Sequence, residues 1–221
     1  IVEPIQGEGG YLVPPKQFHE RLRALTRQHG IMLIVDEVQS GMGRTGKMLA
    51  SEHYGIVPDI LTLAKGIASG LPLGVAVAPA DVMDWPPGAH ASTFGGNPVS
   101  CAAALATIKI LKESLIENAR VVGDYLLDAL RALAERHPLV GDVRGKGLMI
   151  GMELVRDRQT KERATSEREA VVEACFRRGM LVLGAGPNAI RLAPPLVLSK
   201  AQAAEAVRIL DEALSEVEGT R

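Results

Sequence analysis

The chain has 221 residues, a net charge of −1 and a composition that is 47% hydrophobic and 23% charged. These values are typical of a globular protein with a sizeable core, either one large domain or two small ones. The absence of a basic tract and the aromatic content of only 3% argue against nucleic-acid and membrane-surface binding. No apolar run has the length of a membrane span and no signal peptide is found, so we expect a cytoplasmic protein.

The first residues have the pattern of a strand that has already begun. The chain opens with Ile1-Val2-Glu3-Pro4 and has no initiator methionine. Because a compact domain seldom begins with an unprotected core strand, we expect this chain to be a fragment, or one product of a split or cleaved protein.

Strands and helices alternate in the first half of the chain. A helix is expected at residues 15–29, where apolar side chains recur at helical spacing and Gly30 supplies a C-terminal stop. Alternation of this kind predicts an α/β fold with a mainly parallel sheet. The apolar face of the helix would be Phe18, Leu22 and Leu25, and the other elements are strands at 31–35, 60–63 and 73–78 with at best a short helix at 47–54.

After Pro98 the pattern changes to that of a small α+β domain. A small-residue helix is expected around residues 101–106, and Ser166 with Glu169 forms an expected capping box for a helix that ends near Gly179. Ser199 and Gln202 would cap the last helix, whose apolar face is Ala203, Val207, Leu210, Leu214 and Val217. The remaining elements are a helix at 115–137, with the stripe Ile116, Ala119, Val122, Leu126, Leu130 and Leu133, and strands at 148–155, 180–183 and 189–193.

An amine and a carboxylate stand at the ends of two predicted strands. Lys65 follows the strand at 60–63, and Asp36 follows the strand at 31–35. In open α/β sheets, ligands bind outside the carboxyl ends of the strands. A lysine there can form a Schiff base with the aldehyde of pyridoxal phosphate (PLP), and an aspartate can keep its ring nitrogen protonated. Singly each residue could be structural, but the two together favour a PLP site.

Neighbouring residues fit the same interpretation. Val38 could cover one face of a flat ring, Gln39 could donate to its phenolic oxygen, and Gly66 leaves room beside the lysine. The loop at residues 41–46 matches the dinucleotide pattern G-x-G-x-x-G, but the expected long helix does not follow it. Asp59, the only suitably spaced acid, precedes the next strand instead of following it. A turn with glycines at positive φ is therefore favoured over a nicotinamide site.

We interpret both cysteines and two of the histidines as structural residues. Cys101 and Cys175 have no metal-ligand spacing and are expected to be inert buried thiols, so no metal site is predicted. His53 and His90 are interpreted as packing or loop residues.

The chain contains six short motifs in a definite order, at residues 3–10, 36–41, 43–46, 58–60, 65–66 and 93–98. This ordered set resembles the class III, fold-type I PLP-dependent aminotransferases, the group that contains 4-aminobutyrate, ornithine and acetylornithine aminotransferases. The resemblance runs along the whole chain. It implies that residues 1–113 are the C-terminal part of a large PLP-binding domain and that residues 114–221 are a small C-terminal domain.

The resemblance also implies roles for individual residues. Lys65 would be the Schiff-base lysine and proton carrier, and Asp36 would pair with the pyridinium nitrogen. Thr93 would reach the phosphate of the cofactor in the neighbouring subunit of a homodimer. Glu8 and Arg191 resemble a pair in which the arginine binds the α-carboxylate of one substrate and the glutamate neutralises it when an ω-amine enters; a plain structural salt bridge is the other interpretation.

The chain also departs from the family that it resembles. Family members are about twice as long, and their other half carries a phosphate-binding turn and an aromatic ring that stacks on the cofactor. This segment alone is therefore expected to bind PLP poorly or not at all. The predicted reaction is transamination between an ω-amino acid and a keto acid such as 2-oxoglutarate. An amino-acid racemase or epimerase is the other enzymatic interpretation, because the tail at residues 183–191 also resembles racemase relatives. An inactive fragment that serves only as an interaction partner is the third.

Overall fold

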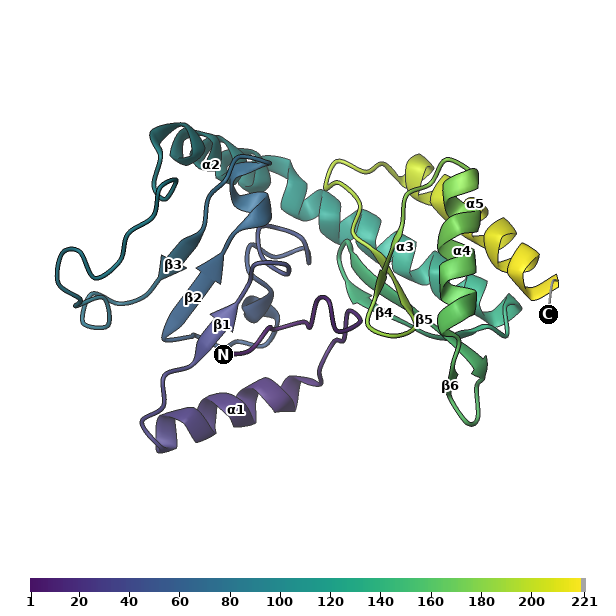
Figure 1. Ribbon diagram of the computed structural model, residues 1–221, viewed down its shortest axis with the longest axis horizontal. Coiled ribbons are helices and arrows are strands. Elements are labelled where there is room, and N and C mark those ends of the chain that lie inside the picture. The colour runs from purple at the N-terminus through teal and green to yellow at the C-terminus, as the bar shows by residue number, and fades with distance from the viewer. Residues whose placement is uncertain (220–221) are drawn as a thin grey trace. The chain divides into compact units, whose positions relative to one another are not determined.

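The structure is a computed structural model that describes residues 1–219 (Figure 1). It confirms the α/β class, since helices and sheets alternate along the chain. The chain divides into two compact units. Unit 1 comprises Ile1–Ile5 and Pro14–Ile116, and unit 2 comprises Gln6–Val13 and Glu117–Arg221. The assignment of residues 114–221 to a small C-terminal domain stays a prediction.

Unit 1 contains a sheet of the order β1-β2-β3. Strand β1 (Ile34–Asp36) runs parallel to β2 (Ile60–Leu63), and β3 (Val75–Val77) runs antiparallel to β2. The expected parallel arrangement therefore holds for β1 and β2 but is wrong for β3. The reason is that only the 3-10 turn η2 (Lys65–Ala68) and a short loop join β2 to β3, and a parallel return needs a longer crossover, usually an α-helix.

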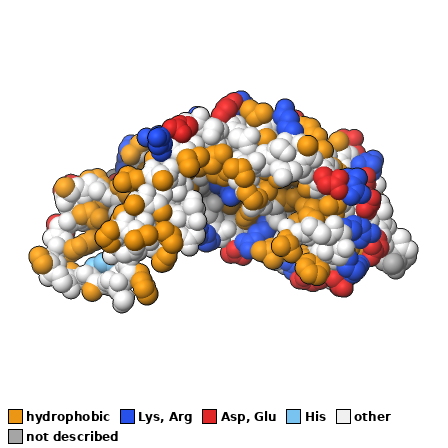
Figure 2. Space-filling model, turned by 90° about the horizontal axis from the view of Figure 1, so that it is seen from above, with side chains coloured by type: hydrophobic (Ala, Val, Ile, Leu, Met, Phe, Trp, Pro, Cys, Tyr) orange, Lys and Arg blue, Asp and Glu red, His pale blue; other side chains and the backbone are white. Residues whose placement is uncertain are grey.

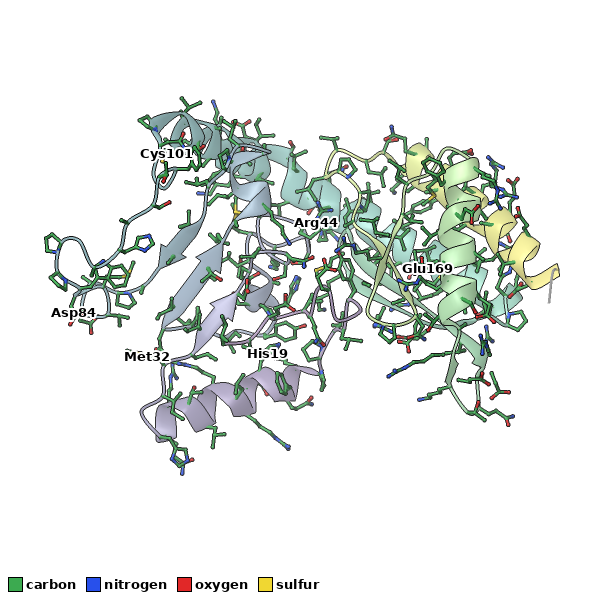
Figure 3. The ribbon with its side chains drawn as sticks, in the orientation of Figure 1. His19, Met32, Arg44, Asp84, Cys101 and Glu169 are labelled. Carbon is green, nitrogen blue, oxygen red and sulfur yellow. The ribbon has the colours of Figure 1, made fainter. Side chains whose placement is uncertain are left out.

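Helix α1 (Lys16–Gln28) forms where expected, but of its predicted apolar face only Leu22 packs against the buried cluster of unit 1. Phe18 and Leu25 are 47% and 53% exposed, whereas His19 is fully buried. His19 Nε2 lies 2.9 Å from the carbonyl oxygen of Pro4, and its ring packs on Tyr54. Figure 3 shows His19 on the side of α1 that faces the strands of unit 1. The buried face is thus selected by tertiary contacts to a polar ring, which apolar spacing does not reveal.

A buried cluster of unit 1 lies around strand β1 and the turn η1 (Ala50–His53). Strand β1 begins three residues later than expected, and Ile31 and Met32 before it are exposed. The turn η1 is the short helix predicted in the loop between β1 and β2. Tyr54 and Ile56, which follow this turn in the chain, form a buried cluster with Leu33 and Val35.

The long helical segment begins with α2 (Pro98–Ile110), whose N-cap is Asn97. The Asn97 Oδ1 atom accepts a hydrogen bond of 2.9 Å from the Ser100 amide. Cys101 on this helix is exposed (labelled in Figure 3), so the prediction of a buried thiol is wrong for Cys101. Cys175 is buried, and its burial raises the pKa of the thiol to about 11. The prediction failed because the small and apolar residues of α2 are spread around the helix, so their spacing does not show which side is covered.

A single π-turn, η3 (Leu111–Leu115), joins α2 to α3 (Ile116–Arg136) without a break. The predicted apolar stripe of α3 is confirmed, because five of its six members are buried. The buried members are Ala119, Val122, Leu126, Leu130 and Leu133.

Unit 2 contains an antiparallel sheet of the order β4-β5-β8-β7, with β6 paired to β5. One face of the sheet carries the side chains that share a core with helices α3, α4 and α5. Strands β4 and β6 were not anticipated, and the strand expected at 180–183 lies later, at β7. The bounds are β4 Val140–Lys146, β5 Met149–Asp157, β6 Glu162–Arg163, α4 Thr165–Arg177, β7 Leu183–Ala185, β8 Ala189–Leu192 and α5 Lys200–Gly219.

The two expected capping boxes have different outcomes. Ser199 and Gln202 cap α5 reciprocally: the Ser199 amide donates to the Gln202 side chain at 2.9 Å, and the Gln202 amide donates to Ser199 Oγ at 3.2 Å. The box at Ser166 and Glu169 is wrong, because α4 begins at Thr165 and Ser166 lies inside the helix. The Ser166 hydroxyl does not cap the helix; its Oγ atom accepts a hydrogen bond of 3.0 Å from Arg156.

Candidate functional site

Asp36 occupies the carboxyl end of β1, as predicted. In the parallel register it lies opposite Thr62 of β2. Its Oδ1 atom accepts hydrogen bonds from the Val38 amide at 2.9 Å and from Thr62 Oγ1 at 3.3 Å. The carboxylate is half-buried and held in one orientation by these donors. Such an arrangement can present a fixed negative charge to a cationic ring nitrogen.

Lys65 stands at the same edge of the sheet, three residues beyond Thr62. It begins the turn η2, and its backbone φ is 47°, in the left-handed region that residues with a side chain seldom adopt. The side chain is exposed, and among residues 1–219 no hydrogen bond or ion pair holds its amine. The structure thus brings an available amine and an oriented carboxylate to neighbouring strand ends, and this donor set fits PLP.

The loop after β1 is built around a buried carboxylate. Glu37 is 1% exposed and accepts hydrogen bonds from Ser40 Oγ at 2.7 Å and from the amides of Ala50 and Ser51 at 2.9 and 2.7 Å. These bonds tie the segment that contains Val38 and Gln39 to the turn η1. Both of those side chains are partly buried, next to Asp36 in the chain.

The glycine-rich loop is a turn. Gly43 and Gly46 have φ values of 83° and 80°, and the helical segment between this loop and β2 is the short turn η1 (Ala50–His53), not a long crossover helix. Asp59 has a structural role, because Arg23 donates to both of its carboxylate oxygens at 2.6 and 2.8 Å. The geometry therefore agrees with the turn and not with a dinucleotide site. His53 Nε2 lies 3.1 Å from both oxygens of Thr45, which is a loop contact as expected.

Thr93 lies in an exposed loop that leads into α2. Within the loop, Ser92 Oγ accepts a hydrogen bond of 3.0 Å from the Gly95 amide. Helix α2 in turn contacts η2, where the hydroxyls of Ser69 and Thr107 are 3.0 Å apart. The loop that carries Thr93 is thereby connected, through α2, to the turn that begins with Lys65.

Glu8 and Arg191 meet although 183 residues separate them. An Arg191 guanidinium nitrogen donates to Glu8 Oε1, and the two side chains are 21% and 66% exposed, respectively. Arg191 lies on β8, and Glu8 lies in the turn of the segment Gln6–Val13, which we call the Glu8 hairpin. Both residues belong to unit 2.

The Glu8 hairpin lies against the sheet of unit 2. It is closed by two hydrogen bonds between Gln6 and Leu12, of 3.0 and 3.1 Å. It rests on β5 at Gly151, where a Cβ atom would come within 2.9 Å of Tyr11 Cβ. The Gly186 amide donates to the Glu8 carbonyl oxygen at 2.7 Å.

Sequence analysis missed three residues that hold these groups. Thr62 and Glu37 orient the groups at the end of β1, and Arg144 of β4 donates to two carbonyl oxygens of the Glu8 hairpin. A hydroxyl opposite Asp36 could have been inferred from strand register. No sequence signal links Arg144 to residues more than 130 positions away.

Comparison with known proteins identifies the family. The family profile "Aminotransferase class-III" matches residues 1–214. The chain belongs to the class-III aminotransferase family.

Two relatives illustrate the range of activities in this family. The chain is 46% identical over 223 residues to a leucine/methionine racemase of Thermococcus litoralis, covering 100% of this chain and 50% of the relative. It is 42% identical to the 4-aminobutyrate aminotransferase GabT of Escherichia coli, covering 98% of this chain and 52% of the relative. The chain therefore spans about half the length of the relatives that it matches.

Solved transaminase structures share the fold. A transaminase from the marine bacterium Virgibacillus has a TM-score of 0.94 at 35% identity, covering 99% of this chain and 52% of that structure. A PLP-bound amine transaminase from an uncultivated Pseudomonas species has a TM-score of 0.91 at 42% identity, covering 97% and 51%. Among the helices of residues 1–219, none has the length and apolar character needed to cross a membrane.

Proposed function

We propose that this protein takes part in PLP-dependent transamination between an ω-amino acid and a keto acid such as 2-oxoglutarate. The observation that carries the proposal is the placement of Asp36 and Lys65 at the ends of adjacent strands, with Lys65 in a left-handed backbone conformation. Strain of this kind is found where function requires an unusual geometry. Family membership and the PLP-bound structural neighbour support the choice of cofactor.

Each residue of the group would have a distinct task. Lys65 would hold the cofactor through its amine and would move the proton that leaves the substrate Cα. Asp36 would keep a negative charge beside the ring nitrogen, with Thr62 and the Val38 amide holding it in place. Val38 would pack on the ring and Gln39 would approach its hydroxyl. Bound PLP supplies an electron sink for the charge that develops at Cα.

The Glu8–Arg191 pair is proposed to distinguish the two substrates. Arg191 presents a planar fork of donors that matches a carboxylate in two hydrogen bonds. Glu8 would neutralise this charge when the substrate brings an ω-amine in place of an α-carboxylate. Glu8 is 66% exposed, so water can solvate its carboxylate when a substrate carboxylate takes its place on Arg191, which limits the cost of the exchange.

A labelling experiment tests the assignment of Lys65. The protein is incubated with PLP, reduced with borohydride and analysed by peptide mapping. The pyridoxyl label is expected on Lys65, and Lys65→Arg, which keeps the charge, should carry none. Label on a different lysine would contradict the assignment. Absence of any visible absorbance change on adding PLP would favour the inactive interaction partner.

Racemisation is the second candidate, favoured by the 46% identity to a leucine/methionine racemase. Both reactions would use Lys65 and differ in where the proton returns. Turnover that requires a keto acid supports transamination. Exchange of the substrate Cα proton with inversion, in the absence of any keto acid, would support the racemase.

A further inference from the structure

Arg144 binds the backbone of the Glu8 hairpin. Its Nη2 atom donates to the carbonyl oxygen of Gly10 at 2.7 Å, and its Nε atom donates to that of Tyr11 at 3.1 Å. The third nitrogen, Nη1, contacts the carboxylates of Asp142 at 2.7 Å and Glu153 at 2.6 Å. All three nitrogens are therefore engaged, and the side chain is only 15% exposed.

The position of Arg144 in the sheet relates it to Arg191. In the strand register, Arg144 of β4 is opposite Gly151 of β5, which is opposite Arg191 of β8. Residues in register across neighbouring strands point to the same face of a sheet. The Glu8 hairpin lies over Gly151, between the two arginines of this row. Arg144 thus holds one side of the hairpin while Glu8 contacts Arg191 on the other.

The charge on Arg144 is balanced within the protein. Two carboxylates contact one of its nitrogens, so the guanidinium has little need of a further anion. Arg144 is therefore suited to holding the backbone and not to binding a second substrate carboxylate. Glu8 itself is 66% exposed, and an exposed ion pair alone gives weak positioning. Hydrogen bonds to the hairpin backbone, from Arg144 and from the Gly186 amide, add positioning to that of the ion pair.

We propose that Arg144 is a positioning residue that keeps Glu8 beside Arg191 by fixing the backbone of the Glu8 hairpin. This inference rests on the proposed role of the Glu8–Arg191 pair in distinguishing substrates. Lysine cannot replace arginine here, because its single ammonium group cannot serve two carbonyl oxygens and two carboxylates in a planar fork.

Hydrogen exchange in the whole chain tests the anchoring without reference to activity. The readout is exchange of the amides of Gln6, Gly10, Tyr11 and Leu12, which are hydrogen-bonded within the hairpin. Arg144→Lys is expected to accelerate their exchange about tenfold, the order expected for loss of a charged hydrogen bond. Arg144→Gln, which also removes the positive charge between Asp142 and Glu153, should accelerate exchange at least as much.

Arg158→Lys is the matched control. Arg158 also donates to backbone carbonyl oxygens in unit 2, those of Val140 at 3.0 Å and His137 at 2.8 Å, but it does not touch the hairpin. Exchange in the hairpin should be unchanged in this variant. Equal exchange in Arg144→Lys and the wild type would overturn the proposal.

Kinetics of the PLP-loaded protein test the consequence for Glu8. Arg144→Lys should raise the KM of the half-reaction with an ω-amine about tenfold and leave the half-reaction with an α-amino acid nearly unchanged. The same pattern is expected for Glu8→Ala. Equal losses in both half-reactions would show a general structural effect and overturn the positioning role. If the wild type transaminates neither substrate, the proposed function fails, while hydrogen exchange still decides whether Arg144 anchors the hairpin.

Discussion

Lys65 adopts a backbone conformation that disfavours any residue with a Cβ atom. Its φ of 47° places it in the left-handed region, and Ser69 in the same short turn has a φ of 48°. A non-glycine residue pays a steric cost there, yet the chain keeps a lysine at this strand end. Stability alone would favour glycine at this position, and the proposed role of the amine gives a reason for a lysine there.

Replacement of Lys65 by glycine should therefore stabilise the fold relative to alanine. Lys65→Gly is expected to have a free energy of unfolding about 1 kcal/mol higher than Lys65→Ala, because alanine retains the strain. Urea denaturation of the two variants measures the difference. Both lose the amine, so neither should acquire the pyridoxyl label, and an alanine variant as stable as the glycine variant would show that the turn is unstrained.

Asp59 shows how a single carboxylate sets a pH dependence. Hydrogen bonds from Arg23 and then from the Leu33 amide lower the pKa of Asp59 from 3.8 to about 2. Because the pKa is lower in the folded state, the stabilisation is fully present above pH 4 and is lost as the pH falls toward 2. This carboxylate links α1 to the start of β2 and has no role in the proposed chemistry.

The expected contribution of Asp59 is roughly 2 kcal/mol at neutral pH. Asp59→Asn should lower the free energy of unfolding by about this amount at pH 6, and the difference from the wild type should shrink as the pH falls through 4 toward 2. Denaturation curves over this range measure it. Asp128→Asn removes a carboxylate that is 78% exposed and should show little difference at any pH. A constant difference for Asp59→Asn would argue against the shifted pKa.

At the scale of elements, the Glu8 hairpin depends on a close approach to β5. A Cβ atom at Gly151 would lie 2.9 Å from Tyr11 Cβ and 3.1 Å from the carbonyl oxygen of Gly10. A methyl group at this position must therefore displace the hairpin or the strand. The sheet itself has a large buried core, so the hairpin is the element that should yield.

Gly151→Ala is expected to loosen the hairpin and leave the sheet folded. Hydrogen exchange of the Gly10 and Tyr11 amides should accelerate, while amides of β4 and β5 keep their protection. The ω-amine half-reaction should weaken as in Glu8→Ala. Gly74→Ala is the control, because a Cβ atom at Gly74 would meet open space. Gly179 is not used, because its positive φ would strain an alanine. Unchanged exchange in Gly151→Ala would show that the strand moves instead.

At the scale of the whole molecule, exposed apolar side chains point to a partner surface. Phe94, Val99 and Leu105 are 67%, 70% and 71% exposed on α2 and the loop before it. Figure 2 shows hydrophobic side chains gathered at the surface of the part of the molecule that contains unit 1. Exposure of this kind marks interaction surfaces. We propose that a second copy of the chain covers this surface in a homodimer and receives Thr93 at its cofactor phosphate.

Complementation tests the shared site. Lys65→Ala and Thr93→Ala should each be inactive, and mixed heterodimers should regain activity at one of two sites, because that site draws its lysine and threonine from the intact copies. Activity of mixed dimers, relative to each parent, is the measurement. With heterodimers confirmed by differential tags, absence of recovery would mean that Thr93 serves its own subunit or is not a phosphate ligand.

The sequence alone determined the local features whose causes are local. The strand at 60–63, the cap formed by Ser199 and Gln202, and the buried stripe of α3 follow from spacing and capping chemistry within a few residues. The strand-end positions of Asp36 and Lys65 could likewise be predicted, because parallel strands bring their carboxyl ends to one edge.

Only the tertiary structure decided the features whose partners are distant in sequence. The buried face of α1 depends on Pro4 and Tyr54, and the exposure of Cys101 depends on what covers α2. The contact of Arg144 with a hairpin more than 130 residues away is of the same kind. Periodicity reports which side chains share a face, but it carries no information on which distant group that face will meet.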